Sequence, residues 1–406
     1  MNLSRRSFVA TTLATTLAAC QRLTGTVHGQ PLTAGTLTLH GSVSVPFTLS
    51  GNHIYIRASL GKTPYAFLFD TGGVASIVPE VQRALNFAVT GAVQVRGIGA
   101  ATSSVEIVRV PELRFGDLSY RGGSFLVLPL PFVLAEPIPG LRFGGILGRE
   151  FFETLVTTID YAKATLTFYE PGFFRADTAA TAFPLAILEG HPNVQAAVNG
   201  HSGNFAVDAG ARGGLTVSRR FAESSGLLNE LGRTIDVVIG RGVGGALAGT
   251  AARASSFSIG TLKIGDPPVT IADAGSGAFS NPDVAGNIGG ETLRRFTVTL
   301  DVPNSKLYLC PNSHLGEPFA FNRAGLFSER DAGGETVVLV VPASPAALAG
   351  VLTGDTIRSV DGVDVARLNV DRVAAAWQRE AGTKLTVVLE RNGKPVRAAF
   401  VLRDLI

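Results

Sequence analysis

The sequence predicts a mainly β protein with two similar lobes that form one cleft, followed by a small C-terminal domain. The first observation behind this prediction is composition: 46% of the 406 residues are hydrophobic, only 17% are charged, and 48 are glycine. Glycines beside runs of Val, Leu, Ile and Thr favour strands and tight turns over helices. A chain of this length can bury several hydrophobic cores. The other two observations are an internal repeat and a C-terminal unit with a different pattern.

The first twenty residues have the pattern of an export signal. Arg5 and Arg6 precede an apolar stretch of about a dozen residues, which is shorter than the roughly 20 needed to span a bilayer. The start SRRSF resembles a twin-arginine export signal, and LAAC resembles a bacterial lipobox, in which the cysteine becomes lipidated. These resemblances imply an exported periplasmic or cell-envelope protein that is anchored to the membrane through lipid on Cys20. We expect residues 21–45 to be a linker.

The internal repeat accounts for the next part of the chain. FLFDTGGVASIV around Asp70 has a counterpart, FAVDAGARGGLTV, around Asp208. The segment that starts at Gly144 also aligns without gaps on the segment that starts at Ala285, over 27 positions. Matched blocks in the same order predict two copies of one β-rich unit, at residues 46–172 and 184–312.

A carboxylate at the end of an apolar strand needs a reason, because an unpaired buried charge is costly. Asp70 follows the apolar run Phe67–Phe69, and Thr71 and Gly72 then allow a sharp turn. If the two units pack about a pseudo-twofold axis, Asp70 meets Asp208 and the pair shares one proton. One carboxylate can then act as a general base on water and the other as a general acid, which is chemistry for peptide hydrolysis without a metal or cofactor.

These residues resemble the aspartic protease family. FLFDTG matches the signature of that family, and GILGREF (145–151) resembles the segment that retropepsin-like members place beneath the active-site loop. Both halves lie in one chain, so the resemblance implies a monomer with no dimer needed to complete the site. It implies catalytic Asp70 and Asp208, with a peptide or protein as substrate. The implied active-site loops contain Thr71, Gly72, Ala209 and Gly210, and the implied flaps that close over substrate contain Gly97, Ile98, Gly99, Gly242, Val243 and Gly244.

The second copy departs from the family pattern at two positions. Ala209 replaces a Thr or Ser whose hydroxyl would bond across the two halves, so we expect a weakened contact that leaves Thr71 without a partner. Gly290 stands where the first copy has Arg149. An isolated Asp-x-Gly is commonly a turn, and the glycine-rich stretches can also be ordinary turns. Asp160 and Asp301, the other matched pair of acids, are expected to be hairpin-turn carboxylates.

Other chemistries find no support in the sequence. Removing Arg5 and Arg6 lowers the net charge from +3 to +1, and no basic patch points to nucleic acid. With Cys20 lipidated, Cys310 is the only thiol, so no intrachain disulfide can form. HExxH and GxSxG motifs are absent, and no zinc-site spacing connects His53, His191 and His201.

The C-terminal unit, residues 322–406, resembles a PDZ domain. SPAALAGVLTGDTIRSVDGVDV (344–365) is similar to a segment in PDZ domains of exported bacterial proteases. The resemblance implies that a protein C-terminus adds as a strand beside a helix, held by the loop that contains Gly325, Leu326 and Phe327. Asp355 is expected to be a turn and helix-start carboxylate.

The function that the sequence favours is an aspartic endopeptidase with a PDZ domain that binds peptide or regulates access. Two alternatives stay open. One is a catalytically weak or inactive peptide-binding scaffold at the cell envelope, which Ala209 favours. The other is a self-processing or signalling protease whose substrate is recruited by the PDZ domain.

Overall fold

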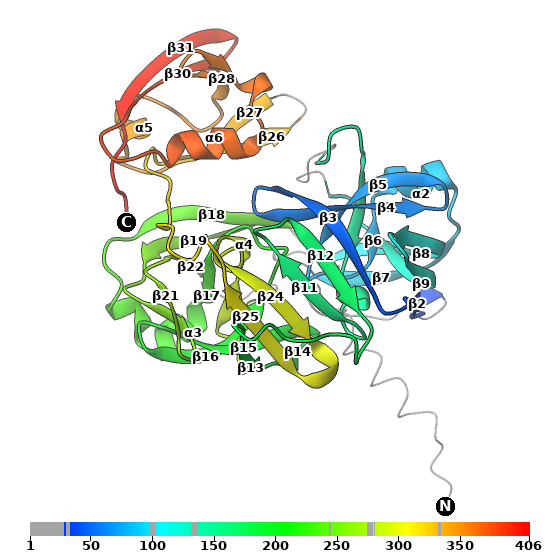
Figure 1. Ribbon diagram of the computed structural model, residues 1–406. Helices are drawn as coiled ribbons and strands as arrows, with labels where there is room; N and C mark the ends of the chain where they lie inside the picture. The colour runs from blue at the N-terminus through cyan, green and yellow to red at the C-terminus, as the bar shows by residue number, and fades with distance from the viewer. Residues whose placement is uncertain are drawn as a thin grey trace, which may run out of the picture.

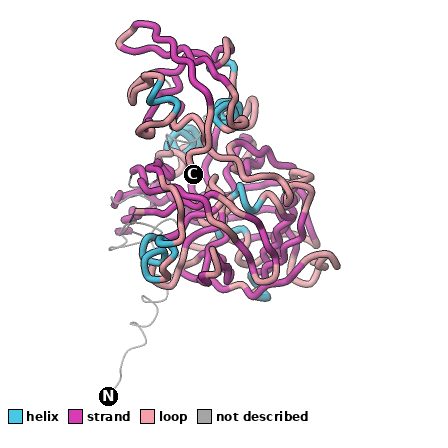
Figure 2. The backbone as a smooth tube through the Cα atoms, turned by 90° about the vertical axis from the view of Figure 1, so that its left-hand side faces the viewer, coloured by secondary structure: helices cyan, strands magenta, loops and turns pink. Residues whose placement is uncertain are grey.

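A computed structural model describes residues 28–29, 33–96, 102–130, 137–242, 245–273, 279, 281–331 and 334–406. Figure 1 shows three bodies: lobe 1, lobe 2 and a smaller C-terminal domain above them. Strands predominate in all three, with short helices between them, as Figure 2 shows. The prediction of a mainly β fold is confirmed. Within the described part of the chain, no helix is long and apolar enough to cross a membrane.

Each body has its own run of elements. Lobe 1 contains β1 (His28–Gly29), β2 (Thr36–Thr38), β3 (Ser42–Ser50), β4 (His53–Leu60), β5 (Thr63–Phe69), β6 (Ser76–Ile77), α2 (Pro79–Leu85), β7 (Val89–Arg96), β8 (Thr102–Phe115), β9 (Leu118–Val127), β10 (Phe143–Leu147), η1 (Arg149–Phe151), β11 (Val156–Asp160) and β12 (Thr165–Tyr169). Lobe 2 contains β13 (Thr181–Pro184), β14 (Ala186–Leu188), β15 (His191–Val198), β16 (His201–Val207), β17 (Leu215–Ser218), α3 (Arg219–Ser224), η2 (Leu227–Asn229), β18 (Ile235–Gly242), β19 (Gly245–Arg253), β20 (Phe257–Ile259), β21 (Leu262–Gly265), β22 (Pro268–Ala272), β23 (Gly286–Ile288), α4 (Gly290–Leu293), β24 (Phe296–Asp301), η4 (Val302–Asn304) and β25 (Lys306–Pro311). The C-terminal domain contains β26 (Leu326–Asp331), β27 (Gly334–Val340), α5 (Pro345–Leu348), β28 (Thr356–Val360), β29 (Val363–Asp364), η5 (Val365–Arg367), α6 (Val370–Trp377), β30 (Lys384–Arg391) and β31 (Lys394–Val401).

The lobes are joined through a shared sheet with pseudo-twofold symmetry. Strand β11 of lobe 1 pairs antiparallel with β24 of lobe 2, and Thr158 lies opposite Thr299. These two threonines are also equivalent in the gapless repeat alignment. Their hydroxyls are 2.8 Å apart and hydrogen-bonded, so the pseudo-twofold axis passes between them. The repeat seen in the sequence is therefore expressed as symmetry of the fold.

The same local topology places one Asp loop in each lobe. In lobe 1, β5 runs parallel to β10 and the amide of Asp70 donates to Leu147 O. In lobe 2, β16 runs parallel to β23 and the amide of Asp208 donates to Ile288 O. The last three residues of each of these two strands, Phe67–Phe69 and Phe205–Val207, are buried and apolar, so they fix where each carboxylate emerges.

The start of lobe 1 differs from the sequence prediction. Residues 36–45, expected as part of a linker, instead contribute β2, which pairs with β9, and the first part of β3, which pairs with β12. Side chains of β3 alternate between exposed and buried at its start, which is the pattern of a half-buried strand. The predicted boundary at residue 46 is therefore too late, because this alternation already begins at Ser42.

The C-terminal domain contacts both lobes. A cluster of apolar side chains joins it to the β18–β19 hairpin of lobe 2, and its members are Ile235, Val237, Ile239, Ala251, Phe321, Phe327, Val341, Leu405 and Ile406. On lobe 1, the carboxylate of Asp371 in α6 accepts hydrogen bonds from Ser50 Oγ (3.2 Å) and from the amide of Gly51. Figure 1 shows α6 and β26 on the side of the domain that faces the lobes.

Candidate active site

Asp70 and Asp208 meet where the two lobes face each other. Both side chains are almost fully buried, at 7% and 9% exposure. A methyl group on Gly72 would lie 3.2 Å from Asp208 Oδ1 and 3.3 Å from Asp70 Oδ1, so both oxygens flank the same point. At Gly210 a methyl group would lie 2.2 Å from the carboxyl carbon of Asp70, so only glycine fits there. The loops thus bring the two carboxyl groups together, as the repeat predicted.

The loop amides bond each carboxylate in nearly the same way. The amide of Gly72 donates to Asp70 Oδ1 at 2.8 Å, and the amide of Gly210 donates to Asp208 Oδ1 at 2.9 Å. Asp208 receives two further donors: the amide of Ala211 reaches Oδ1 at 3.1 Å, and Asn287 Nδ2 reaches Oδ2 at 2.9 Å. The side chain of Asp208 is therefore better supplied with hydrogen-bond donors.

The electrostatics favour one proton on the pair. Burial, and then the charge of Asp208, raise the pKa of the Asp70 carboxyl well above its ordinary value. Burial also raises the pKa of Asp208, but the hydrogen bonds from Asn287 and the loop amides work against that rise. A hydrogen bond between the two carboxyls raises the pKa of Asp70 and lowers that of Asp208. Two buried carboxyls this close therefore favour one shared proton, and the donors to Asp208 oppose the rise of its pKa.

Thr71 keeps a contact across the lobes despite Ala209. Its Oγ1 donates to Val207 O at 2.6 Å and accepts from the amide of Ala209 at 2.9 Å. The expectation that Ala209 leaves Thr71 without a partner is therefore wrong, because Thr71 bonds to the backbone of the opposite loop and not to its side chain. Ala209 has no hydroxyl that could bond to the backbone of the lobe 1 loop in return. Of these two residues, only Thr71 makes a side-chain hydrogen bond across the lobes.

A turn of lobe 1 gives the loop of lobe 2 additional support. His53 Nε2 donates to Gly210 O at 2.9 Å, and Asn52 Nδ2 donates to Arg212 O at 3.0 Å. Burial, with the charge of Arg212, lowers the pKa of His53 to about 3, so the ring is neutral. A methyl group on Gly290 would lie 2.6 Å from Asn52 O. Gly290 therefore replaces the Arg149-type residue because the turn packs against its backbone.

Two antiparallel strand pairs flank the glycine-rich stretches in the sequence. Strands β7 and β8 pair up to Arg96 and Thr102, and strands β18 and β19 pair up to Gly242 and Gly245. Gly242 ends β18. The other predicted flap residues, Gly97, Ile98, Gly99, Val243 and Gly244, lie outside the described residues, as does Cys20. Flap function stays a prediction, now attached to hairpins in corresponding positions of the two lobes.

The predicted peptide-binding loop of the C-terminal domain has internal partners. Asn322 Oδ1 accepts from the amides of Ala324 (3.0 Å) and Gly325 (2.9 Å). Leu326 is buried in the domain core, and Phe327 packs in the cluster that contacts lobe 2. β26 is an edge strand of its sheet, as strand addition requires. A carboxylate that bound the Gly325 amide would have to displace Asn322.

The three other acids considered in the sequence analysis, Asp160, Asp301 and Asp355, form hydrogen bonds or ion pairs within turns. Asp160 Oδ1 accepts from the amide of Lys163 at 3.0 Å, and Asp301 Oδ1 from Asn304 Nδ2 at 2.9 Å, as expected for turn carboxylates. Asp355 pairs with Arg391 and accepts from the amide of Leu352, which makes it a turn carboxylate but not a helix start.

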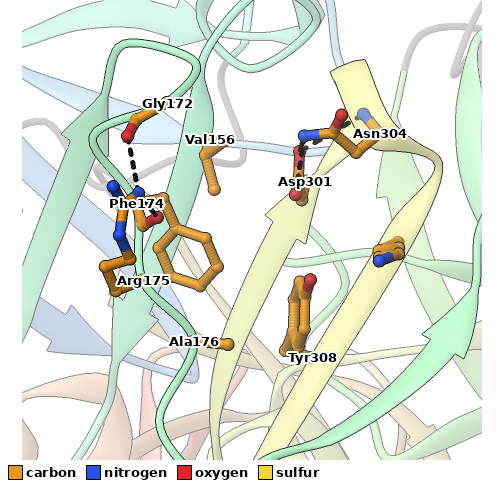
Figure 3. Close-up of a pocket in the computed structure, with 9 residues that line it drawn as sticks. Val156, Gly172, Phe174, Arg175, Ala176, Asp301, Asn304 and Tyr308 are labelled. Atoms are coloured by element: carbon orange, nitrogen blue, oxygen red, sulfur yellow. Dashed lines mark hydrogen bonds between the residues drawn. The ribbon is translucent and has the colours of Figure 1, made fainter.

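A surface cavity of about 560 Å³ lies beside the shared sheet, away from both Asp loops. Figure 3 shows Asp301 and Asn304 on one side of it and Phe174 and Arg175 on the other. Arg175 Nη1 donates to the backbone oxygens of Gly172 and Phe174, so its charge is already engaged.

Sequence reasoning missed Asn287 and His53. Asn287 stands opposite Ile146 in the repeat alignment, and an amide that replaces an aliphatic side chain beneath an Asp loop was the available signal. His53 was considered only as a zinc ligand. No local pattern shows that it reaches Gly210, because that contact crosses 157 residues.

Comparisons with known proteins find two family models that match parts of the chain. Residues 56–151 and 194–292 match the family model of aspartyl proteases, and residues 336–391 match that of PDZ domains. The aspartic proteinase from Irpex lacteus aligns at 15% identity and a TM-score of 0.45, over 68% of this chain and 99% of that chain. Basic 7S globulin from soybean aligns at 14% identity and a TM-score of 0.39, over 70% and 98%. No curated protein sequence matches the chain.

The class of protein follows from the two family matches. The two lobes belong to the aspartyl protease family, and the C-terminal domain is a PDZ domain. These domains support a protease-type function, with a protein as substrate and peptide binding by the PDZ domain.

Proposed function

We propose that the protein is an aspartic endopeptidase whose catalytic pair is Asp70 and Asp208. The observation that carries the proposal is the meeting of two buried carboxyls, each at the end of an equivalent strand, with one proton favoured between them. A water molecule between the carboxyls would lose a proton to Asp208 as its oxygen attacks the peptide carbonyl carbon. Asp70 would give its proton to the carbonyl oxygen.

The second half of the reaction uses the same two groups in reverse. The tetrahedral diol returns one hydroxyl proton to Asp70, and Asp208 passes its proton to the amide nitrogen as the carbon–nitrogen bond breaks. The products are a carboxylic acid and an amine, and the pair regains its starting protonation. Substrate would lie as an extended segment beneath the β7–β8 and β18–β19 hairpins.

The alternative is a peptide-binding scaffold with little or no activity. Ala209 favours it, because the second loop lacks the reciprocal hydroxyl. The two bonds made by Thr71 Oγ1, and the donors from His53 and Asn287, favour activity, because they hold both carboxyls in place.

Incubation with an unstructured polypeptide from about pH 3 to about pH 9 separates these functions. We expect the wild-type protein to cleave it, and Asp70→Asn and Asp208→Asn each to lower kcat by about 10³-fold or more. Thermal unfolding of both variants should match the wild type, because Asn preserves the side-chain shape. Activity that survives either substitution would refute the shared pair, and binding without cleavage by the wild type would establish the scaffold.

We also propose export and lipid anchoring through Cys20, on the strength of the twin-arginine and lipobox patterns. Mass spectrometry of the protein purified from bacterial membranes should find a mature chain that starts at lipidated Cys20. A mature chain with any other first residue would refute the anchor.

A further inference from the structure

The two Asp loops differ in the residue on the neighbouring strand beneath each of them. Asn287 lies in the middle of β23, which runs parallel to β16 and forms the floor under Asp208. The equivalent residue under Asp70 is Ile146, in the middle of β10. The gapless repeat alignment makes these two positions counterparts. Ile146 has no polar atom to offer, so the donor is present in one lobe only.

The side-chain amide of Asn287 points its N–H group at Asp208. Its Nδ2 donates to Asp208 Oδ2 at 2.9 Å, while its Oδ1 is buried and has no partner among the described residues. The flipped amide would place two acceptor oxygens against each other unless Asp208 were protonated. An amide that presents its N–H group to the carboxylate therefore matches the ionised form.

Asn287 supplies the only side-chain N–H donor to either carboxyl within the described structure. Asp70 otherwise receives backbone amides of Gly72 and Gly73, and Asp208 receives those of Gly210 and Ala211. A hydrogen bond to the ionised form of an acid favours that form. The pKa directions agree, since Asn287 is the strongest influence that lowers the pKa of Asp208.

Few other charged or titratable groups face this pair. Tyr161 is buried, and the charge of Asp208 contributes to the raised pKa of its hydroxyl. His53 bonds to the carbonyl of Gly210 and is neutral, and Arg212 lies against His53. None of these groups is changed by a substitution at Asn287, so its effect on the two carboxyls can be isolated.

We propose that Asn287 is a positioning residue that assigns the two roles of the pair: it holds Asp208 ionised as the base and leaves the shared proton on Asp70, the acid. The inference rests on the proposed peptidase function, because roles of acid and base have meaning only in a reaction. It concerns the resting enzyme, before water is activated. The Asn287 amide thus gives the two carboxyls of an otherwise symmetric pair different tendencies to ionise.

Three variants test the assignment. Asn287→Ile gives lobe 2 the residue of lobe 1, Ile146→Asn gives Asp70 the same donor, and the double variant exchanges the two. In Asn287→Ile we expect the acidic limb of the pH profile of kcat/KM to move up by about one pH unit, because Asp208 then ionises less readily. In the double variant we expect the carboxyl with the lower pKa to be Asp70.

Carboxyl titration by ¹³C NMR provides a readout that needs no activity. We expect the pKa of Asp208 to rise in Asn287→Ile, and the pKa of Asp70 to fall in Ile146→Asn. The second result remains decisive if Asn287→Ile fails to fold. Unchanged titration of both carboxyls in the variants would overturn the role of Asn287. A wild-type protein that cleaves nothing would refute the peptidase function, while the titrations would still decide whether Asn287 orders the two pKa values.

Discussion

The two Asp loops have the same backbone and different support. In lobe 1, Thr71 reaches the opposite loop with its own hydroxyl and bonds to Val207 O and the amide of Ala209. In lobe 2, Ala209 has nothing to return, and the loop is instead held from lobe 1 by His53, which donates to Gly210 O. The comparison teaches that the second Asp loop can keep its position without a hydroxyl at residue 209, because a neighbouring turn supplies a hydrogen bond to that loop.

The neighbouring turn also connects the active site with the PDZ domain. Residues 50–53 of lobe 1 contact Asp371 of helix α6 at one end and Gly210 of the second loop at the other. The same domain packs on the β18–β19 hairpin, one of the two proposed flaps. In lobe 2, therefore, both the Asp loop and the β18–β19 hairpin contact other parts of the chain.

The largest expected difference between the loops comes from the glycine that lies two residues after each Asp, Gly72 in lobe 1 and Gly210 in lobe 2. Gly210→Ala places a methyl group 2.2 Å from the carboxyl carbon of Asp70, whereas Gly72→Ala makes its nearest contact at 3.2 Å. We expect Gly210→Ala to abolish cleavage and lower the free energy of unfolding by about 3 kcal/mol, with a smaller loss for Gly72→Ala. Denaturant unfolding and peptide cleavage measure both. Equal losses of stability and activity in the two variants would contradict the difference in space around the two glycines.

The contact made by Thr71 is tested by a substitution of the same shape. Thr71→Val removes the bonds to Val207 O and to the amide of Ala209, and we expect a loss of about 2–3 kcal/mol in unfolding free energy together with lower kcat. Ala209→Ser in the wild-type protein offers the missing hydroxyl and should raise the free energy of unfolding by about 1 kcal/mol if the hydroxyl forms a hydrogen bond. A Thr71→Val protein with wild-type stability would show that the hydroxyl is not needed.

His53 provides the corresponding test in lobe 2. His53→Leu leaves Gly210 O without its donor, and we expect a loss of about 1–3 kcal/mol near pH 7. The folded-state pKa of about 3 lies below the ordinary 6.5, so the stability from this neutral ring is present above about pH 6.5 and is lost as pH falls toward 3. The variant should therefore approach the wild type in acid. His201→Leu, which removes a surface contact with Glu230, is the control for loss of a histidine side chain and should leave the stability near pH 7 almost unchanged.

The smallest expected effect is at the contact with the PDZ domain. Asp371→Asn removes the charge that accepts from Ser50 and Gly51, and we expect a loss of about 1 kcal/mol or less with the fold intact. Hydrogen exchange at the Gly51 amide should become faster in the variant. Unchanged exchange there would show that this contact does not order the turn.

Much of the fold could be predicted from the sequence because the two lobes correspond to an internal sequence repeat. Matching FLFDTGG with FAVDAGA located both carboxylates, and apolar strands before each one set their position. The lobe 1 boundary was misjudged because β2 and β3 are recognisable only by their pairing with distant strands.

The support of the second loop could not be predicted in the same way. The sequence shows that Ala209 lacks a hydroxyl, but not that Thr71 would find backbone partners instead. Gly290 could be seen as a departure, yet its reason is the turn at Asn52, more than two hundred residues earlier. Contacts between units that are distant in sequence decide these details.

Titration of the two carboxyls in the wild-type protein tests the central claim most directly. ¹³C NMR of labelled aspartates, with Asp70→Asn and Asp208→Asn to assign the signals, follows each group with pH. We expect both pKa values above the ordinary aspartate value, with Asp70 the higher, so that one proton is shared over the interval between them. Two carboxyls that both titrate at the ordinary value would contradict a shared proton.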